Sequence, residues 1–188
     1  MLKRVLQISV LLLTLFGSLR LYYNKEVGKV IDNYNGVNIY FNNIPFTSKG
    51  DSFGADGYYY GRKYQGVEFV KRYYDHQFQH RFSTDIEKGR DFYDFNIKDG
   101  EINGVLELIQ YSNPSVYSVK EGDILVFKPS LLKPNGGVAI VSKVGNNELE
   151  LVQQNCWKKS RDIISLENRE NKWYITDEGV IGRLSKNN

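Results

Sequence analysis

The chain of 188 residues has the length of one domain, and 41% of its residues are hydrophobic while 25% are charged. This composition provides enough apolar side chains for one buried core. The formal net charge of +3 lies in residues 1–22, where Lys3, Arg4 and Arg20 accompany no acidic residue. The remainder holds 22 basic and 22 acidic residues, a balance that excludes the basic surface of a nucleic-acid-binding domain.

Residues 1–22 have the pattern of an export signal or a membrane anchor. A positive start at Lys3 and Arg4 is followed by an apolar run over residues 5–19. The run has about 15 residues, fewer than the ~20 of a relaxed membrane span, and fits the apolar region of a secretory signal. We expect export to a bacterial periplasm or cell envelope, either with cleavage near Ser18 or with residues 5–19 kept as an anchor.

The next segments are polar and rich in turn residues. Residues 23–34 are expected to form a linker, and the Asn-Gly pair at 35–36 predicts a turn before the alternating strand VNIYF. Residues 42–62 are rich in Gly, Asn, Ser and Tyr and are predicted to form a loop. The tyrosines at 58–60 either line a substrate groove or anchor this loop on the core, and the second reading is favoured.

The stretch YQGVEFVKRYY, residues 64–74, leads into a predicted helix over about 67–78. Val67, Val70 and Tyr74 follow the i, i+3, i+7 spacing of one helix face. A charged, turn-rich segment follows, and residues 105–111 are predicted to form a short helix.

The second half of the chain is predicted to form a series of strands. Gly-Asn-Asn at 145–147 marks a hairpin turn between two of them. A helix followed by several strands predicts an α+β domain with an antiparallel sheet, here over residues 35–188. The predicted strands cover residues 122–127, 137–144, 148–155, 172–176 and 180–184.

Cysteine and histidine are too few for most metal and disulfide sites. The single cysteine, Cys156, excludes an intrachain disulfide and any cluster of several cysteines. His76 and His80 would share a helix face, but no HExxH motif surrounds them and no third ligand is evident. We therefore predict a polar helix edge, with no metal and no cofactor.

Four landmarks together resemble a known family. They are the helix start YQ-x-VEFVKRYY, the strand GDILVF, the strand G-x-VAIVSKV and the strand end QQN. The order of these motifs along the chain and their residues resemble the CHAP family of papain-like cysteine amidases and peptidases, above all the amidase domain of glutathionylspermidine amidases and cell-wall hydrolases. The resemblance covers about residues 35–184 and implies a papain-like CHAP fold, with an N-terminal helix packed on an antiparallel sheet behind an export segment.

The family implies a cysteine at the helix start, a histidine at the start of the VAIV strand and a polar third residue on the next strand. A helix N-terminus favours the thiolate, the imidazole transfers the proton, and the third group orients the imidazole. Carried onto this chain, the nucleophile position is Gly66, the base position is Gly137 and the orienting position is Gln153. Both chemical side chains are therefore absent.

The resemblance also implies ligand contacts beside these positions. Gln65, Tyr64 and Asn155 are the expected binding residues. Cys156, next to the third position, is expected to be a small packing residue or an incidental thiol rather than a relocated nucleophile. The last strand departs from the family, because Arg183 stands where relatives tend to have tryptophan.

Three functions stay open at this point. The first is an exported, catalytically inactive CHAP-like protein that binds peptidoglycan peptide or a small γ-glutamyl or amide ligand. The second is an active cysteine amidase or peptidoglycan hydrolase, with Cys at 66 and His at 137, present here in an inactivated form. The third is an envelope protein-interaction module on a borrowed fold. None of the three involves nucleic acid, and the sequence as written favours a protein that is not an enzyme.

Overall fold

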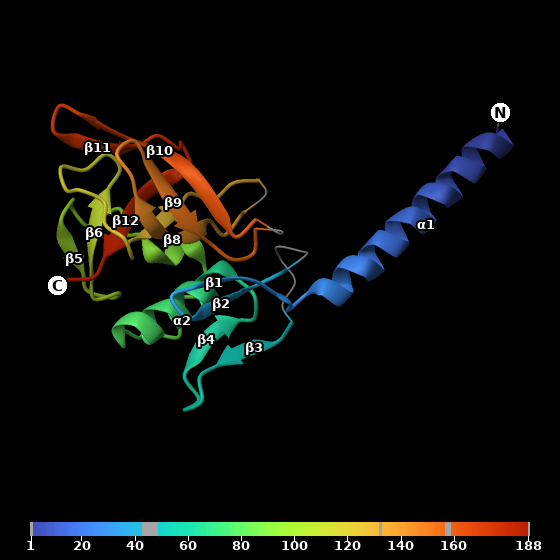
Figure 1. Ribbon diagram of the computed structural model, residues 1–188, viewed down its shortest axis with the longest axis horizontal. Helices are drawn as coiled ribbons and strands as arrows, with labels where there is room; N and C mark the ends of the chain where they lie inside the picture. The colour runs from blue at the N-terminus through green and yellow to red at the C-terminus, as the bar shows by residue number, and fades with distance from the viewer. Residues whose placement is uncertain (1, 43–48, 132, 157–158, 188) are drawn as a thin grey trace.

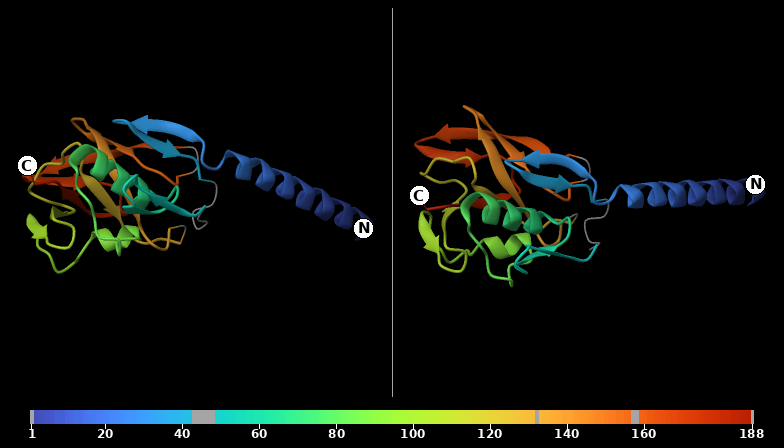
Figure 2. Two further views of the ribbon diagram at one scale, coloured as in Figure 1. Left: turned by 90° about the horizontal axis from the view of Figure 1, so that it is seen from below. Right: turned by 60° about the horizontal axis from the view of Figure 1, so that its bottom comes forward.

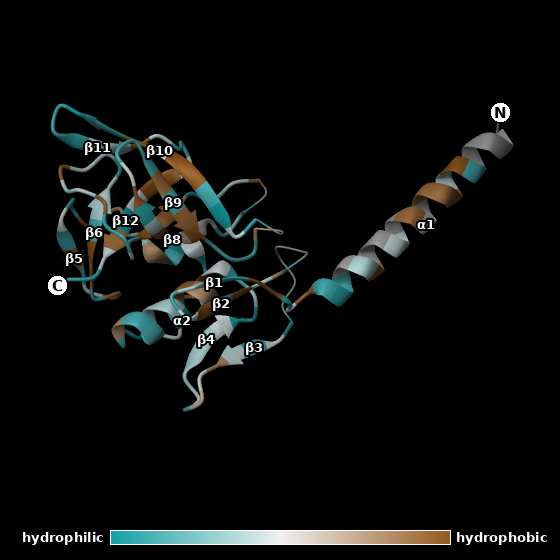
Figure 3. Ribbon diagram, viewed as in Figure 1, coloured by the Kyte–Doolittle hydropathy of each residue, from teal (hydrophilic) through white to brown (hydrophobic). Residues whose placement is uncertain are grey.

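Helix α1, Leu2–Glu26, extends away from the rest of the protein (Figures 1 and 2). The computed structural model describes residues 2–42, 49–131, 133–156 and 159–187. Within these ranges, no helix combines the length and the apolar character that crossing a membrane requires. The middle of α1 is hydrophobic (Figure 3), with Leu11 and Leu15 exposed. The expected roles in export or anchoring stay predictions.

The domain is built on a large antiparallel sheet. Among the described residues this sheet has eight strands, and each neighbouring pair is antiparallel. The predicted α+β architecture with mostly antiparallel strands is thereby confirmed. In spatial order the strands are β11 (Lys172–Ile175), β10 (Arg161–Arg169), β9 (Glu148–Val152), β8 (Gly137–Val144), β7 (Ile124–Phe127), β12 (Val180–Ser185), β6 (Leu108–Ser112) and β5 (Glu101–Asn103).

Two small hairpins precede and flank the helix of the domain. The first joins β1 (Val30–Tyr34) to β2 (Val37–Tyr40) through Asn35 and Gly36. Both turn residues have positive φ, 49° and 83°, which suits the twist of a tight hairpin. The second hairpin joins β3 (Asp51–Phe53) to β4 (Tyr59–Arg62).

Helix α2 spans Gly66–Phe78, and its apolar face packs in the core. Gln65 before it is extended (φ −91°, ψ 157°), and Gln79 after it is left-handed (φ 50°), so backbone conformation stops the helix at both ends. Val70 and Tyr74, two of the predicted apolar positions, are fully buried. Burial of an aliphatic side chain such as Val70 contributes about 1.5–3 kcal/mol. The predicted helix over 67–78 is confirmed.

Two hydrophobic clusters lie on opposite faces of the central strands, because side chains alternate along a strand. On β8, Val138 packs in the cluster that includes α2, while Ala139 and Val141 pack in the other. Phe127 on β7 pairs with Gly137 and packs against the second cluster. Position 137 therefore belongs, by register, to the strand face that turns away from α2.

The structure corrects several predicted elements. The helix predicted over 105–111 is wrong, because residues from Leu108 onward belong to strand β6. Leu108 is completely buried in the sheet. A short apolar run of this kind is compatible with a helix or with a strand, so the sequence alone does not distinguish them. Strand β10 lies outside the strands that the sequence predicts, and β1 lies inside the expected linker 23–34. The predicted loop 42–62 holds β3 and β4, while residues 43–48 lie outside the described ranges.

A short 3₁₀ helix, η1 (Gly89–Phe92), packs on the sheet beside α2. A Cβ atom at Gly89 would lie 2.6 Å from the backbone nitrogen of Gly137, so the two backbones touch directly. Gly136 has φ 71°, and a Cβ there would lie 2.7 Å from the Phe127 carbonyl oxygen. These close contacts require glycine and place η1 against the start of β8.

Candidate functional site

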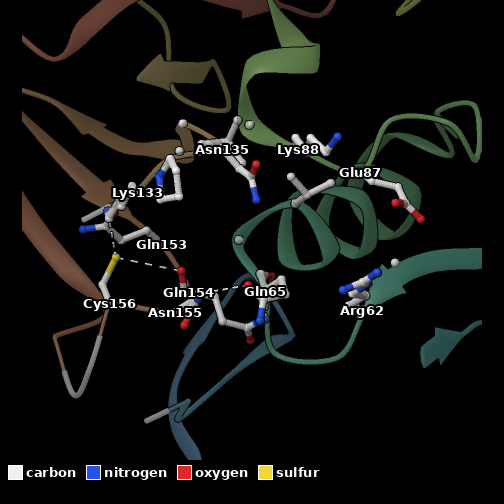
Figure 4. Close-up of a pocket in the computed structure, with 18 residues that line it drawn as sticks. Arg62, Gln65, Glu87, Lys88, Lys133, Asn135, Gln153, Gln154, Asn155 and Cys156 are labelled. Atoms are coloured by element: carbon white, nitrogen blue, oxygen red, sulfur yellow. Dashed lines mark hydrogen bonds between the residues drawn. The ribbon is translucent and has the colours of Figure 1, made fainter. Parts of the chain in front are cut away.

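The start of α2, the start of β8 and the end of β9 enclose a cleft of about 240 Å³ (Figure 4). Residues 61–62, 87–89 and 133–136 form its remaining walls. Gly66, Gly137 and Gln153 all line this cleft. The structure therefore brings together the three positions that sequence analysis carried over from the CHAP family.

The expected binding residues divide into two groups. Gln65 and Asn155 both line the cleft, and the Asn155 Nδ2 donates a hydrogen bond to Gln65 Oε1 at 2.7 Å. Tyr64 lies outside the cleft lining. Its φ of 66° directs the ring toward Tyr40, with 5.3 Å between the ring centroids, and toward Gly28.

Both glycine positions have room for a side chain. A Cβ at Gly66 would lie 3.5 Å from the Gln154 carbonyl oxygen and 3.6 Å from the Val138 carbonyl oxygen. At Gly137 the nearest atoms would be the Lys133 Cδ and the Phe127 Cβ, both at 3.7 Å. These are ordinary van der Waals distances, so neither glycine is required by its surroundings.

The two positions do not face each other. A side chain at Gly66 would begin 3.8 Å from the Val138 Cγ2, on the α2 side of β8. A side chain at Gly137 would begin against Phe127 and Lys133, on the other strand face. Val138, rather than Gly137, thus presents its side chain to the start of α2.

A buried amide holds the floor of the cleft in place. Gln154 is 3% exposed, and its Nε2 donates to the Gln65 carbonyl at 2.9 Å and to Glu68 Oε2 at 2.7 Å. Its Oε1 accepts from the Tyr40 backbone N–H at 2.9 Å. One side chain therefore ties the segment that follows β9 to α2 and to β2, which fixes where α2 begins relative to the sheet.

Arg72 completes this buried network. Its Nε pairs with Glu68 at 2.5 Å, its Nη1 donates to the Asn38 carbonyl at 2.9 Å, and its guanidinium lies 5.2 Å from the Tyr40 ring centroid. The Ser52 hydroxyl donates to the same carboxylate at 2.9 Å. Because Glu68 is 3% exposed, these partners compensate a charge that would otherwise be costly to bury.

Four charged side chains line the cleft: Arg62, Glu87, Lys88 and Lys133. The Lys133 Nζ lies 3.5 Å from the Cys156 Sγ, which also lines the cleft. Burial raises the pKa of the Cys156 thiol, and the nearby lysine opposes this only in part. The thiol is therefore mainly neutral at pH 7 and is a poor nucleophile.

Neither histidine belongs to the cleft lining. His80 is buried between the Leu106 carbonyl, 2.9 Å from Nε2, and Lys186, whose Nζ lies 3.0 Å from Nδ1. The His76 ring contacts the Gln77 amide. In the described ranges, no group of three His, Cys, Asp or Glu residues is arranged to hold a metal. The cleft residues therefore offer hydrogen bonding and charge, and no thiol–imidazole pair lies at positions 66 and 137.

The tyrosines beside the cleft serve mainly as anchors. The Tyr58 hydroxyl donates to the Phe82 carbonyl at 2.8 Å, and the Tyr60 hydroxyl donates to Asp75 at 2.6 Å. The Tyr59 ring packs on the exposed Phe53 with 5.4 Å between centroids, and its hydroxyl donates to Glu87 Oε1 at 3.4 Å rather than to the core. The anchoring interpretation thus describes Tyr58 and Tyr60, and Tyr59 lies at the surface of the hairpin.

Sequence reasoning missed the two walls formed by residues 87–89 and 133–136. No local pattern marks these loops, because they contribute glycine backbone and single charged or amide side chains. The nearest signal is the Gly-Gly pair at 136–137, whose close packing against η1 brings both loops to the start of β8.

No protein-family model matches the chain, and no curated protein matches it. Among solved structures, one titled "The crystal structure of Ly7917" is similar, with 12% sequence identity and a TM-score of 0.35. The similarity covers 75% of this chain and 58% of that chain, so this chain spans less than two thirds of the other's length. At this TM-score the similarity carries no conclusion about fold or function.

Proposed function

We propose that this is an exported binding protein with a papain-like CHAP fold that takes up a peptide or a related amide compound without hydrolysing it. The ligand class is peptidoglycan peptide or a small γ-glutamyl or amide ligand. The observation that carries the proposal is an open cleft at the start of α2 with glycine at positions 66 and 137. Those are the positions where the family resemblance implies the nucleophile and the base.

The polar lining of the cleft supports an amide ligand. Gln65, Asn135, Gln153 and Asn155 all contribute side-chain amides to the lining. A primary amide has two N–H donors and one carbonyl acceptor, the same groups that a peptide backbone presents. A ligand rich in peptide groups is therefore complementary to these walls.

Co-sedimentation with isolated peptidoglycan sacculi tests the proposal. The full chain, kept soluble in mild detergent, is compared with Gly66→Leu, which places a bulky side chain at the cleft floor. Gly104→Leu is the matched control, because a Cβ at Gly104 meets no atom within 4 Å. We expect the wild-type protein and the control to sediment with the sacculi and Gly66→Leu to stay in solution.

Two outcomes would contradict the proposal. Sedimentation that persists in Gly66→Leu would remove the cleft as the binding site. No sedimentation of the wild-type protein would remove peptidoglycan as the ligand and would favour the third hypothesis, an envelope protein partner.

The space at both glycines favours a second candidate function, an active cysteine amidase present in an inactivated form. The diverging directions of the two positions argue against it, because an imidazole at 137 would leave β8 on the face away from α2. The double variant Gly66→Cys/Gly137→His decides between them in an amide-hydrolysis assay. Turnover above that of Gly66→Cys alone would support the amidase, and equal rates would support the binding protein.

A further inference from the structure

The charges around the cleft are unevenly distributed. Arg62, Lys88 and Lys133 are cationic, and Glu87 is the single anionic side chain of the lining. Outside residues 1–22 the chain carries equal numbers of basic and acidic residues, so this excess is local. A concave site lined by one sign of charge concentrates ligands of the opposite sign.

No carboxylate of the described residues lies within ion-pair distance of these three cations. Within the part of the chain that the structure describes, none of Arg62, Lys88 and Lys133 forms an ion pair. By contrast, Arg161 on β10 pairs with the carboxylates of Asp32 on β1 and Glu150 on β9. The Lys133 Nζ contacts the Cys156 Sγ at 3.5 Å, and burial raises the pKa of this thiol, which favours its neutral form.

The cations come from three separate segments and surround the cleft. Arg62 lies on β4, Lys88 precedes η1, and Lys133 lies in the loop before β8. Figure 4 shows Lys133 on one side of the cleft and Arg62 on the opposite side, with Lys88 between them along the upper wall. A ligand that enters between these walls therefore meets positive charge from several directions.

The size of the cleft limits how much of a ligand it holds. Its volume of about 240 Å³ is below the ~300–1,000 Å³ typical of sites that enclose a whole drug-sized molecule. The cleft thus fits the end of a longer molecule rather than its whole length. Among the ends of a peptide, only the C-terminal carboxylate has the charge that Arg62, Lys88 and Lys133 complement.

We propose that the cleft captures the carboxylate end of a peptide, with Lys133 as a principal charge partner and the amide side chains of the walls bonding the preceding peptide groups. This inference rests on the proposed peptide-binding function and adds the chemical group that is recognised. A charge-assisted hydrogen bond is stronger than a neutral one, so the carboxylate carries much of the affinity.

The test uses N-acetyl-alanyl-alanine with a free carboxylate and the same dipeptide as its C-terminal amide. Binding of each to the full-length protein is measured by titration with nuclear magnetic resonance detection at low salt. We expect the acid to bind about tenfold more tightly than the amide, the size of one charge-assisted hydrogen bond. Lys133→Gln should abolish most of this difference.

Lys172→Gln is the matched control, because Lys172 is exposed on β11 and lies outside the cleft. An equal loss of acid binding in Lys133→Gln and Lys172→Gln would reduce the effect to general charge attraction and overturn the inference. Equal binding of acid and amide would also overturn it while leaving the proposed function in place.

Two further outcomes are separate from these. If neither dipeptide binds, the proposed peptide-binding function fails, and the inference fails with it. If inorganic phosphate binds in the cleft and the dipeptide acid does not compete with it, the anion site is one for phosphate groups and the carboxylate proposal is overturned.

Discussion

Replacement of Gln154 by alanine is the sharpest test of how the cleft floor is held. The side chain makes neutral hydrogen bonds with the Gln65 carbonyl and the Tyr40 N–H, and bonds to the charged groups of Glu68 and Arg72. Each neutral bond is worth about 1 kcal/mol, and the bond to the Glu68 carboxylate about 1.5–3 kcal/mol. We expect Gln154→Ala to lower the free energy of unfolding by about 3.5–5 kcal/mol.

Urea denaturation followed by circular dichroism measures this loss, and thermal unfolding should show a fall in Tm of about 7–20 °C for a chain of this size. Gln153→Ala is the control, because Gln153 is half-buried and its bond among the described residues is made by the backbone N–H, to the Ser160 carbonyl. We expect a change below about 0.5 kcal/mol for the control. A loss below about 1 kcal/mol in Gln154→Ala would refute the role assigned to this network.

Two more predictions concern packing and pH. Gly89→Ala should lower the free energy of unfolding, measured in urea, by about 1–3 kcal/mol, because the added Cβ would collide with the Gly137 backbone. The control Gly104→Ala should change it little. Equal effects of the two substitutions would contradict the close contact at Gly89. Burial and Lys186 lower the pKa of His80. Since the unfolded state binds the proton more readily, stability should fall as pH drops below about 6.5 and level off below the folded pKa. The urea midpoint should therefore fall more between pH 7.5 and 5.5 in the wild type than in His80→Asn, and identical shifts would refute this.

The parts of the fold that sequence patterns predict are those with strong, regular burial. Helix α2 is recognisable because its apolar positions are all turned toward one core. Strand β10 is not recognisable from the sequence, because Leu166 is its one buried residue. Ile163, whose apolar side chain suggests a core position, is 61% exposed. The apolar residues of the run at 105–111 are compatible with the repeat of a helix and with that of a strand. Part of the run is a strand because it pairs with β12 and β5.

The candidate site was only partly accessible to the same reasoning. The resemblance to the CHAP family implies that Gly66, Gly137 and Gln153 are neighbours in space, and all three line one cleft. The resemblance does not determine which face of β8 carries position 137, because that depends on the pairing with Phe127. The cations at 88 and 133 reach the cleft through tertiary contacts between loops, which leave no local trace in the sequence.

The open space above Gly66 has a practical consequence for chemical labelling. The chain contains one cysteine, and the raised pKa of the Cys156 thiol slows its reaction with maleimides near neutral pH. A cysteine introduced at 66 would sit at a helix N-terminus, where thiols ionise more readily, on a Cβ with ordinary clearances. A fluorophore attached there would report directly on whatever enters the cleft, and the native thiol would remain as a slow, distinguishable background.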